Sequence, residues 1–196
     1  MRTDVIPTAS PAAGRGGRIL GAAMLLAILA GCAPNAVVAP GFTLTSDENQ
    51  PWSLAAQRGH SVLLTFGFTH CADTCPATLA KLARLTRPLA HGASVEIAMV
   101  TVDPRRDTPP VLHRFVARFE RPIIGLTGTP KQIAAVESAY HVWAQRTPGA
   151  HVSPRGYDVA HSAVIYAIDA RGAIRAISND DDSQAALTGV VRELTN

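Results

Sequence analysis

Two cysteines separated by three residues, Cys71 and Cys75, are the residues of this chain best suited to chemistry. If the segment between them is already helical, residues four apart lie on one face, about 6 Å from each other. That separation suits a disulfide, and it equally suits two thiolates that bind one small, soft cation. A helix N-terminus stabilises a thiolate, and the polar Asp73 and Thr74 indicate an accessible loop. The spacing therefore predicts a reactive pair, and it leaves redox chemistry, metal binding and a structural disulfide open.

A histidine is the third candidate group. His161 directly precedes an apolar run at 162–168 that is typical of a strand, and from that position it could face the cysteines. His70 is adjacent to Cys71 and is a weaker candidate for metal binding, with its side chain expected to point away from the helix face. His141 and His151 are further alternatives, whereas His60, His91 and His113 are expected to be solvated.

The elements that must position the cysteines can be read on either side of them. Residues 61–68 are almost continuously apolar, the pattern of a central parallel strand covered on both faces. Pro76 suits the first turn of a helix, and apolar residues at helical spacing follow over 77–89. The cysteines are therefore expected at the carboxyl end of a strand, where open α/β sheets build their sites.

The rest of the chain predicts a thioredoxin-like α/β fold, with a central mixed sheet flanked by helices. A hairpin is expected within 42–53, strands at 95–102, 123–126, 142–146 and 162–168, and a hairpin partner at 173–177. Helices are expected at 111–119, 130–140 and 183–194, and residues 147–158 are expected to form a loop. The strand–cysteine–helix opening and the terminal hairpin plus helix are what point to the thioredoxin-like arrangement.

The N-terminal segment resembles a bacterial lipoprotein signal. An unbroken apolar run at 19–30 is too short to span a bilayer comfortably, and it ends in Leu29-Ala30-Gly31-Cys32. We expect a signal peptide at 1–31, lipid attachment at Cys32, a tether at 32–41 and the folded domain at 42–196. The alternative is an ordinary signal peptide with a chance cysteine. A lipidated Cys32 would hold the domain on a membrane of the bacterial envelope, facing the periplasm or another extracytoplasmic side.

The overall charge gives no indication of a nucleic-acid partner. The chain has 18 basic and 15 acidic residues, but three of the former and one of the latter lie in 1–31, which leaves 15 and 14. The pI near 9.0 is therefore partly a property of the signal segment, and it does not indicate a nucleic-acid partner. With Cys32 lipidated, Cys71 and Cys75 are the remaining thiols, in a compartment where disulfides persist.

Four separated blocks, at 66–76, 101–109, 125–130 and 157–162, resemble the Sco/SenC copper chaperones of cytochrome c oxidase assembly. The resemblance implies a tethered thioredoxin-like domain that binds copper, as Cu(I) or Cu(II), through Cys71, Cys75 and His161. It implies as partner the copper-binding subunit of the oxidase, with other copper chaperones or thioredoxin-like reductants as further candidates. The sequence departs from the family at Ala72, where proline is usual, and at Ala160, where aspartate is usual. Because a carboxylate often orients a metal-bound imidazole, Asp158 is the candidate replacement.

Two thiolates and one imidazole form a soft ligand set that suits Cu(I) and can also hold Cu(II). Three ligands leave a position through which a recipient's ligand can enter. The main alternative is an extracytoplasmic thiol–disulfide oxidoreductase that uses Cys71 and Cys75 as its redox-active pair, and whether the chain is an enzyme stays open. A purely structural envelope lipoprotein would fit the anchor but not the reactive loop.

Overall fold

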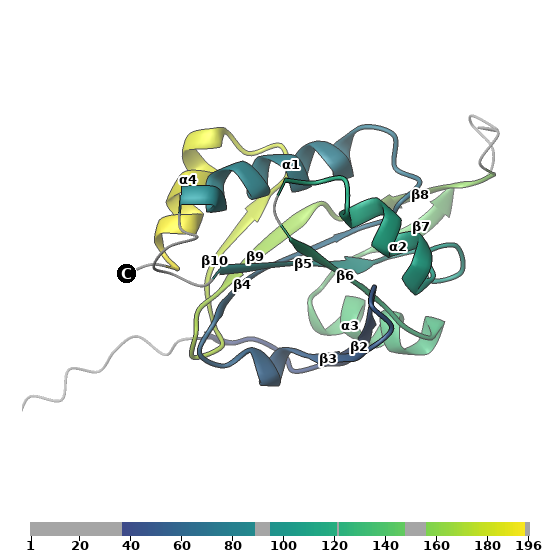
Figure 1. Ribbon diagram of the computed structural model, residues 1–196, viewed down its shortest axis with the longest axis horizontal. Helices are drawn as coiled ribbons and strands as arrows, with labels where there is room; N and C mark the ends of the chain where they lie inside the picture. Colours follow the sequence, from purple (N-terminus) through teal and green to yellow (C-terminus); the bar gives the residue numbers. More distant parts are fainter. Residues whose placement is uncertain (1–36, 89–94, 121, 148–155, 195–196) are drawn as a thin grey trace, which may run out of the picture. The chain divides into compact units, whose positions relative to one another are not determined.

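The computed structural model describes residues 37–88, 95–120, 122–147 and 156–194 (Figure 1). The predicted signal peptide and the first half of the tether, which includes Cys32, lie outside these residues. Within the described ranges, no helix has the length and apolarity that crossing a membrane requires. The elements in chain order are β1 (Val37–Val38), β2 (Thr43–Ser46), β3 (Pro51–Ser53), the 3₁₀ helix η1 (Leu54–Gln57), β4 (Ser61–Gly67), α1 (Thr74–Thr86), β5 (Val95–Thr101), α2 (Pro109–Val116), β6 (Ile123–Thr127), α3 (Pro130–Ala139), β7 (Ala144–Thr147), β8 (Asp158–His161), β9 (Val164–Ile168), β10 (Ala173–Asn179) and α4 (Gln184–Arg192).

Eight of the described strands form one mixed sheet in the order β1-β10-β9-β4-β5-β6-β2-β3. The central strands β4, β5 and β6 are parallel, and the flanking pairs are antiparallel. Strands β7 and β8 pair only with each other, as a separate antiparallel ribbon. The mixed sheet and the N-terminal β2–β3 hairpin are as the sequence predicts.

Helices cover both faces of the sheet (Figure 1). One core packs sheet residues against α1, α2 and α4, and the other packs them against α3 and the N-terminal strands. Neighbouring residues of β4 belong to opposite cores, Leu63 to the first and Leu64 to the second, and both are fully buried. This two-sided burial explains why β4 is apolar throughout rather than alternating. Because β4 is packed on both faces, its end at Gly67 is held in place, and the segment that carries the cysteines follows it.

Two short strands depart from the predicted elements. Val37 and Val38 lie within the predicted tether, yet they pair with Ile174 and Ala173 of β10. The sequence predicts a loop over 147–158 and places His161 directly before a strand, but residues 158–161 form β8, so His161 ends a strand. Both strands are defined by partners distant in sequence, and a two- or four-residue strand carries too little periodicity to be recognised alone.

Candidate metal centre

The loop that carries the cysteines runs from the end of β4 to the start of α1, and we call residues 68–73 the cysteine loop. Helix α1 begins at Thr74, which places Cys75 in its first turn. Asp73 is at the N-cap but makes no capping hydrogen bond through its side chain. Instead, Cys71 Sγ accepts a hydrogen bond from the Cys75 N–H at 3.3 Å. The two cysteines therefore share one helix end, as their spacing predicts, and both are free thiols.

The two thiols differ in acidity because they differ in surroundings. A hydrogen bond from the Cys75 thiol and three backbone N–H groups of the helix start lower the pKa of Cys71 to about 6, although partial burial opposes this. The pKa of Cys75 is raised, because it is the donor to Cys71, because it is buried, and because the Cys71 thiolate repels a second negative charge. Near neutral pH the pair therefore holds one thiolate, on the more exposed cysteine, and one proton, on the buried cysteine.

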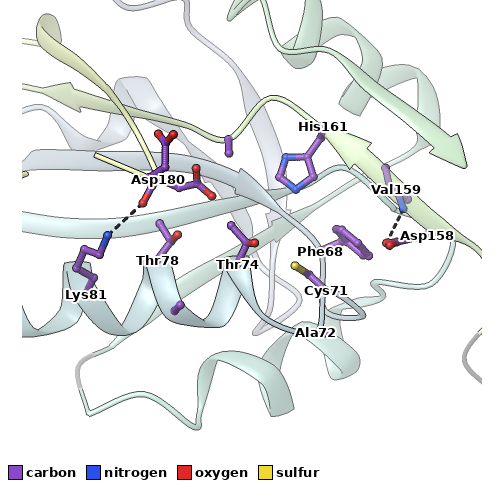
Figure 2. A pocket seen from close by; sticks show the side chains of 13 residues that line it. Phe68, Cys71, Ala72, Thr74, Thr78, Lys81, Asp158, Val159, His161 and Asp180 are labelled. Atoms are coloured by element: carbon purple, nitrogen blue, oxygen red, sulfur yellow. Dashed lines mark hydrogen bonds between the residues drawn. The ribbon is translucent and has the colours of Figure 1, made fainter. Parts of the chain in front are cut away.

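His161 lies at the end of β8 and faces the same pocket as Cys71 (Figure 2). Its Nδ1 lies 3.0 Å from the carbonyl oxygen of Ser162, which can only accept, so Nδ1 carries the hydrogen. That leaves the lone pair of Nε2 available, and Nε2 lies 3.7 Å from Cys75 Sγ. The ring also meets the ring of Phe68 edge to face, with centroids 5.9 Å apart. The imidazole is therefore held in the tautomer that a metal ligand needs.

The second-sphere role that the sequence assigned to Asp158 is filled by a backbone group instead. Asp158 Oδ1 accepts from the N–H of Val159 at 2.8 Å. The contact that orients the imidazole comes from the carbonyl of Ser162. Ala160 therefore provides no carboxylate next to the site, but the His161 ring is still oriented by a hydrogen bond. A carbonyl acceptor has no signature in the sequence, which is why it could not be predicted.

Cys71 and His161 line the same surface pocket, which has a volume of about 500 Å³ (Figure 2). Its wall also includes Phe68, Asp180 and Lys81. The Lys81 ammonium donates to the backbone carbonyls of Asp180, at 3.1 Å, and Asp182, at 3.4 Å, which ties α1 to the loop after β10. The acidic side of this pocket was missed by sequence reasoning, because nothing local connects residue 180 with residue 71.

Two of the other candidate histidines, His70 and His141, do not line this pocket. His70 turns from the pocket toward Asp107: its Nδ1 lies 3.1 Å from Thr69 Oγ1 and 3.8 Å from Asp107 Oδ1. His141 is exposed and has a positive φ of 53°. The remaining alternative, His151, is outside the described residues.

The donor chemistry fits a soft metal ion, but the three side chains are not drawn together around one point. In the described ranges, no group of three or more His, Cys, Asp or Glu side chains is arranged to hold an ion. Two of the three expected ligands are nevertheless in contact, at 3.7 Å from Cys75 Sγ to His161 Nε2. A sulfur at about 2.3 Å and a nitrogen at about 2.0 Å from one tetrahedral ion lie roughly 3.5 Å apart. The third expected ligand atom, Cys71 Sγ, accepts the hydrogen bond of the Cys75 N–H instead.

Comparison with known proteins identifies the family. Residues 31–196 match the model of the SCO1/SenC family. The chain belongs to that family. It is 32% identical over 165 residues to protein SCO1 homolog 1, a mitochondrial protein of Arabidopsis thaliana, with 83% of this chain and 48% of that protein covered. The chain thus spans about half the length of this curated relative.

Solved SCO1/SenC structures share the fold. Arabidopsis thaliana ScoI with copper bound superposes with a TM-score of 0.74 at 32% identity, covering 81% of this chain and 99% of that one. Bradyrhizobium japonicum ScoI with copper bound gives 0.70 at 28% identity, covering 81% and 99%. The thioredoxin-like fold predicted from the sequence is therefore confirmed, and so is the family resemblance.

Proposed function

We propose that this chain is a copper-binding metallochaperone of the SCO1/SenC family, acting in the assembly of cytochrome c oxidase. Its cargo is copper, taken as Cu(I) or Cu(II) by Cys71, Cys75 and His161. The observation that carries the proposal is that His161, which lines the same pocket as Cys71, places its Nε2 3.7 Å from Cys75 Sγ. Copper bound in the ScoI structures of Arabidopsis thaliana and Bradyrhizobium japonicum supports it.

The protonation of the two cysteines suits reversible copper binding. One thiolate is available near neutral pH on Cys71, and copper displaces the proton of Cys75, because metal binding requires deprotonated thiols. Cys71 is half-buried and lies on a loop at the pocket, so it is the ligand that an incoming protein can reach first. We propose that the recipient is the copper-binding subunit of cytochrome c oxidase, and that a cysteine or histidine of that subunit enters through the pocket.

The proposal includes a lipid anchor at Cys32. The Leu29-Ala30-Gly31-Cys32 sequence supports it, with the apolar run before it, and the first described strand begins at Val37. An anchor so close to the domain would keep the pocket near a membrane surface, on the extracytoplasmic side of a bacterial envelope. A membrane-bound oxidase could be served from that position.

A thiol–disulfide oxidoreductase remains the second candidate, and the acidity difference between the two cysteines favours it. A low-pKa, accessible Cys71 beside a protonated Cys75 is the arrangement by which a dithiol attacks and then resolves a mixed disulfide. In that case the same pair would maintain the ligand thiols of the oxidase subunit in the reduced state. His161 would then have no necessary part in the chemistry.

Copper titration of the reduced and the oxidised protein separates these functions. The reduced protein should bind one copper per chain, and the Cys71–Cys75 disulfide form should bind far more weakly, because it offers no thiolate. A parallel disulfide-reductase assay should show little turnover. Equal copper binding in both redox states would place the metal elsewhere, and rapid reductase turnover without copper binding would favour the oxidoreductase.

A further inference from the structure

The strand that carries His161 has little support of its own. Strand β8 belongs to a two-stranded ribbon, in which Ala144 of β7 pairs with His161. An isolated two-stranded ribbon is at best marginally stable in water. Next to the Ala144–His161 pair, the ribbon is extended by the Ser162 N–H, which donates to the carbonyl of Trp143 at 2.8 Å. Val159 of β8 is buried in one of the two cores, and Ala144 of β7 packs against it. Polar contacts with the main sheet add to this packing, and they determine whether the end of the ribbon stays opposite the cysteines.

Tyr157, the residue just before β8, makes that connection. Its hydroxyl donates to Asp103 Oδ1 at 2.6 Å, and its carbonyl accepts from Arg106 Nη1 at 2.8 Å. Its ring makes cation–π contacts with two guanidinium groups, with Arg106 Cζ at 3.8 Å and Arg146 Cζ at 4.5 Å from the ring centroid. Arg146 belongs to β7, so both strands of the ribbon meet at this ring.

Asp103 is the buried charge on which these contacts converge. Its side chain is 1% exposed. It forms an ion pair with the Arg106 Nε and lies 4.0 Å from the Arg146 Nη2. A buried carboxylate that lacks its partners is costly, so Asp103 holds Arg106 and Tyr157 in place as much as they satisfy it. The start of β8 is thereby fixed to the segment that follows β5.

The same segment holds the cysteine loop through a second buried carboxylate, Asp107. Thr69 donates to it twice, from its N–H at 3.0 Å and from its hydroxyl at 2.6 Å. The Thr101 hydroxyl donates to Asp107 at 2.6 Å and accepts from the Asp103 N–H at 2.9 Å, which links the Asp107 carboxylate to the backbone of Asp103. We call residues 102–108 the bridge loop, because one of its aspartates reaches the cysteine loop and the other reaches the histidine ribbon.

We propose that the bridge loop is the positioning device of the site: Asp107 sets the cysteine loop, and Asp103, through Arg106 and Tyr157, sets His161. Tyr157 is then a positioning residue, although it is not a ligand. The part of this inference that concerns copper rests on the proposed function. The part that concerns the place of His161 rests on the contacts alone.

Tyr157→Leu and Tyr157→Phe test the proposal. Leucine removes both the hydroxyl and the ring, whereas phenylalanine removes only the bond to Asp103. In the metal-free protein, amide exchange in β8 should quicken at least about tenfold in Tyr157→Leu, and the nuclear Overhauser contact between the rings of Phe68 and His161 should weaken. Cu(II) affinity should fall by about tenfold, and the thiolate-to-Cu(II) absorption should change, as when groups that support a ligand are removed. Cu(I) binding, carried mainly by the two sulfurs, should change less. Tyr157→Phe should show the same effects more weakly.

Tyr140→Phe is the matched control, because it also removes one tyrosine hydroxyl bond, here the 2.8 Å bond to the Pro40 carbonyl. It should lower thermal stability without changing β8 exchange or the Cu(II) spectrum. Unchanged β8 exchange and an unchanged Phe68–His161 contact in Tyr157→Leu would overturn the inference whatever copper does. If wild-type protein binds no copper while the exchange and ring-contact effects appear, the proposed function fails and the positioning role stands.

Discussion

The acidity of Cys71 can be tested by changing its neighbour and measuring the rate at which it is alkylated. The largest cause of its low pKa is the hydrogen bond from the Cys75 thiol, with backbone N–H groups second. Cys75→Ala removes the first and leaves the second. The pH midpoint of Cys71 alkylation should therefore rise from about 6 in the wild type toward, but not fully to, the ordinary value of 9.0. Cys75→Ser is the matched control, since its hydroxyl can still donate, and it should raise the midpoint less.

The size of the rate change follows from the thiolate fraction. At pH 6, a pKa of about 6 leaves about half of Cys71 ionised, against about 0.1% for a thiol of pKa 9.0. The less basic thiolate is also less nucleophilic, by about 20-fold for a pKa lower by three at a Brønsted slope near 0.45. The net expectation at pH 6 is that wild-type Cys71 reacts about 20-fold faster than an ordinary thiol, an advantage that Cys75→Ala should largely remove.

The assay is iodoacetamide labelling of fully reduced protein from pH 4.5 to 9.5, with each cysteine followed by mass spectrometry of its peptide. Cys75 should stay unlabelled throughout most of this range, because it is buried and its pKa is raised. The reasoning would be refuted if Cys71 titrated near 9 in the wild type, if Cys75→Ala left its midpoint unchanged, or if Cys75 were labelled first.

Two further predictions concern packing behind the site and the membrane anchor. In Gly67→Ala the new Cβ would lie 3.1 Å from Cys75 Sγ, so we expect the free energy of unfolding in urea to fall by about 1–3 kcal/mol and copper binding to weaken. Gly41→Ala is the control, because nothing lies within 4 Å of its new Cβ, and it should change stability little. Equal effects of the two substitutions would contradict the packing argument. Cys32→Ser should release the protein from membranes or leave an unprocessed precursor, and an unchanged mass together with unchanged membrane fractionation would exclude lipid attachment.

The sequence predicts the cysteine half of the site well because its signals are local. A strand buried on both faces is apolar throughout, a proline marks the helix start, and two cysteines four apart meet on the helix end. Each of these depends on neighbours within a few residues. The prediction that Cys71 and Cys75 lie together, at the carboxyl end of β4, follows from them.

The histidine half depends on contacts that the sequence does not display. Strand β8 exists because it pairs with β7 and because Tyr157 reaches Asp103, 54 positions away. The motif at 101–109 was recognised as a family block, but its two buried aspartates could not be given roles until their partners Thr69 and Tyr157 were placed beside them. His161 was therefore predicted to face the cysteines by analogy with a fold, and its orientation by a carbonyl was not predicted.

The most direct test of the account is a titration of reduced wild-type protein and His161→Ala with Cu(II), followed by absorption spectroscopy and by the copper content of the purified complex. Wild-type protein should bind one copper per chain, with an intense thiolate-to-Cu(II) absorption. In His161→Ala this absorption should be lost and Cu(II) binding greatly weakened, whereas Cu(I) binding should fall less, because Cu(II) prefers more ligands that include nitrogen. If the Cu(II) spectrum and stoichiometry survive in His161→Ala, then His161 is not a ligand and the assignment of Cys71, Cys75 and His161 is wrong.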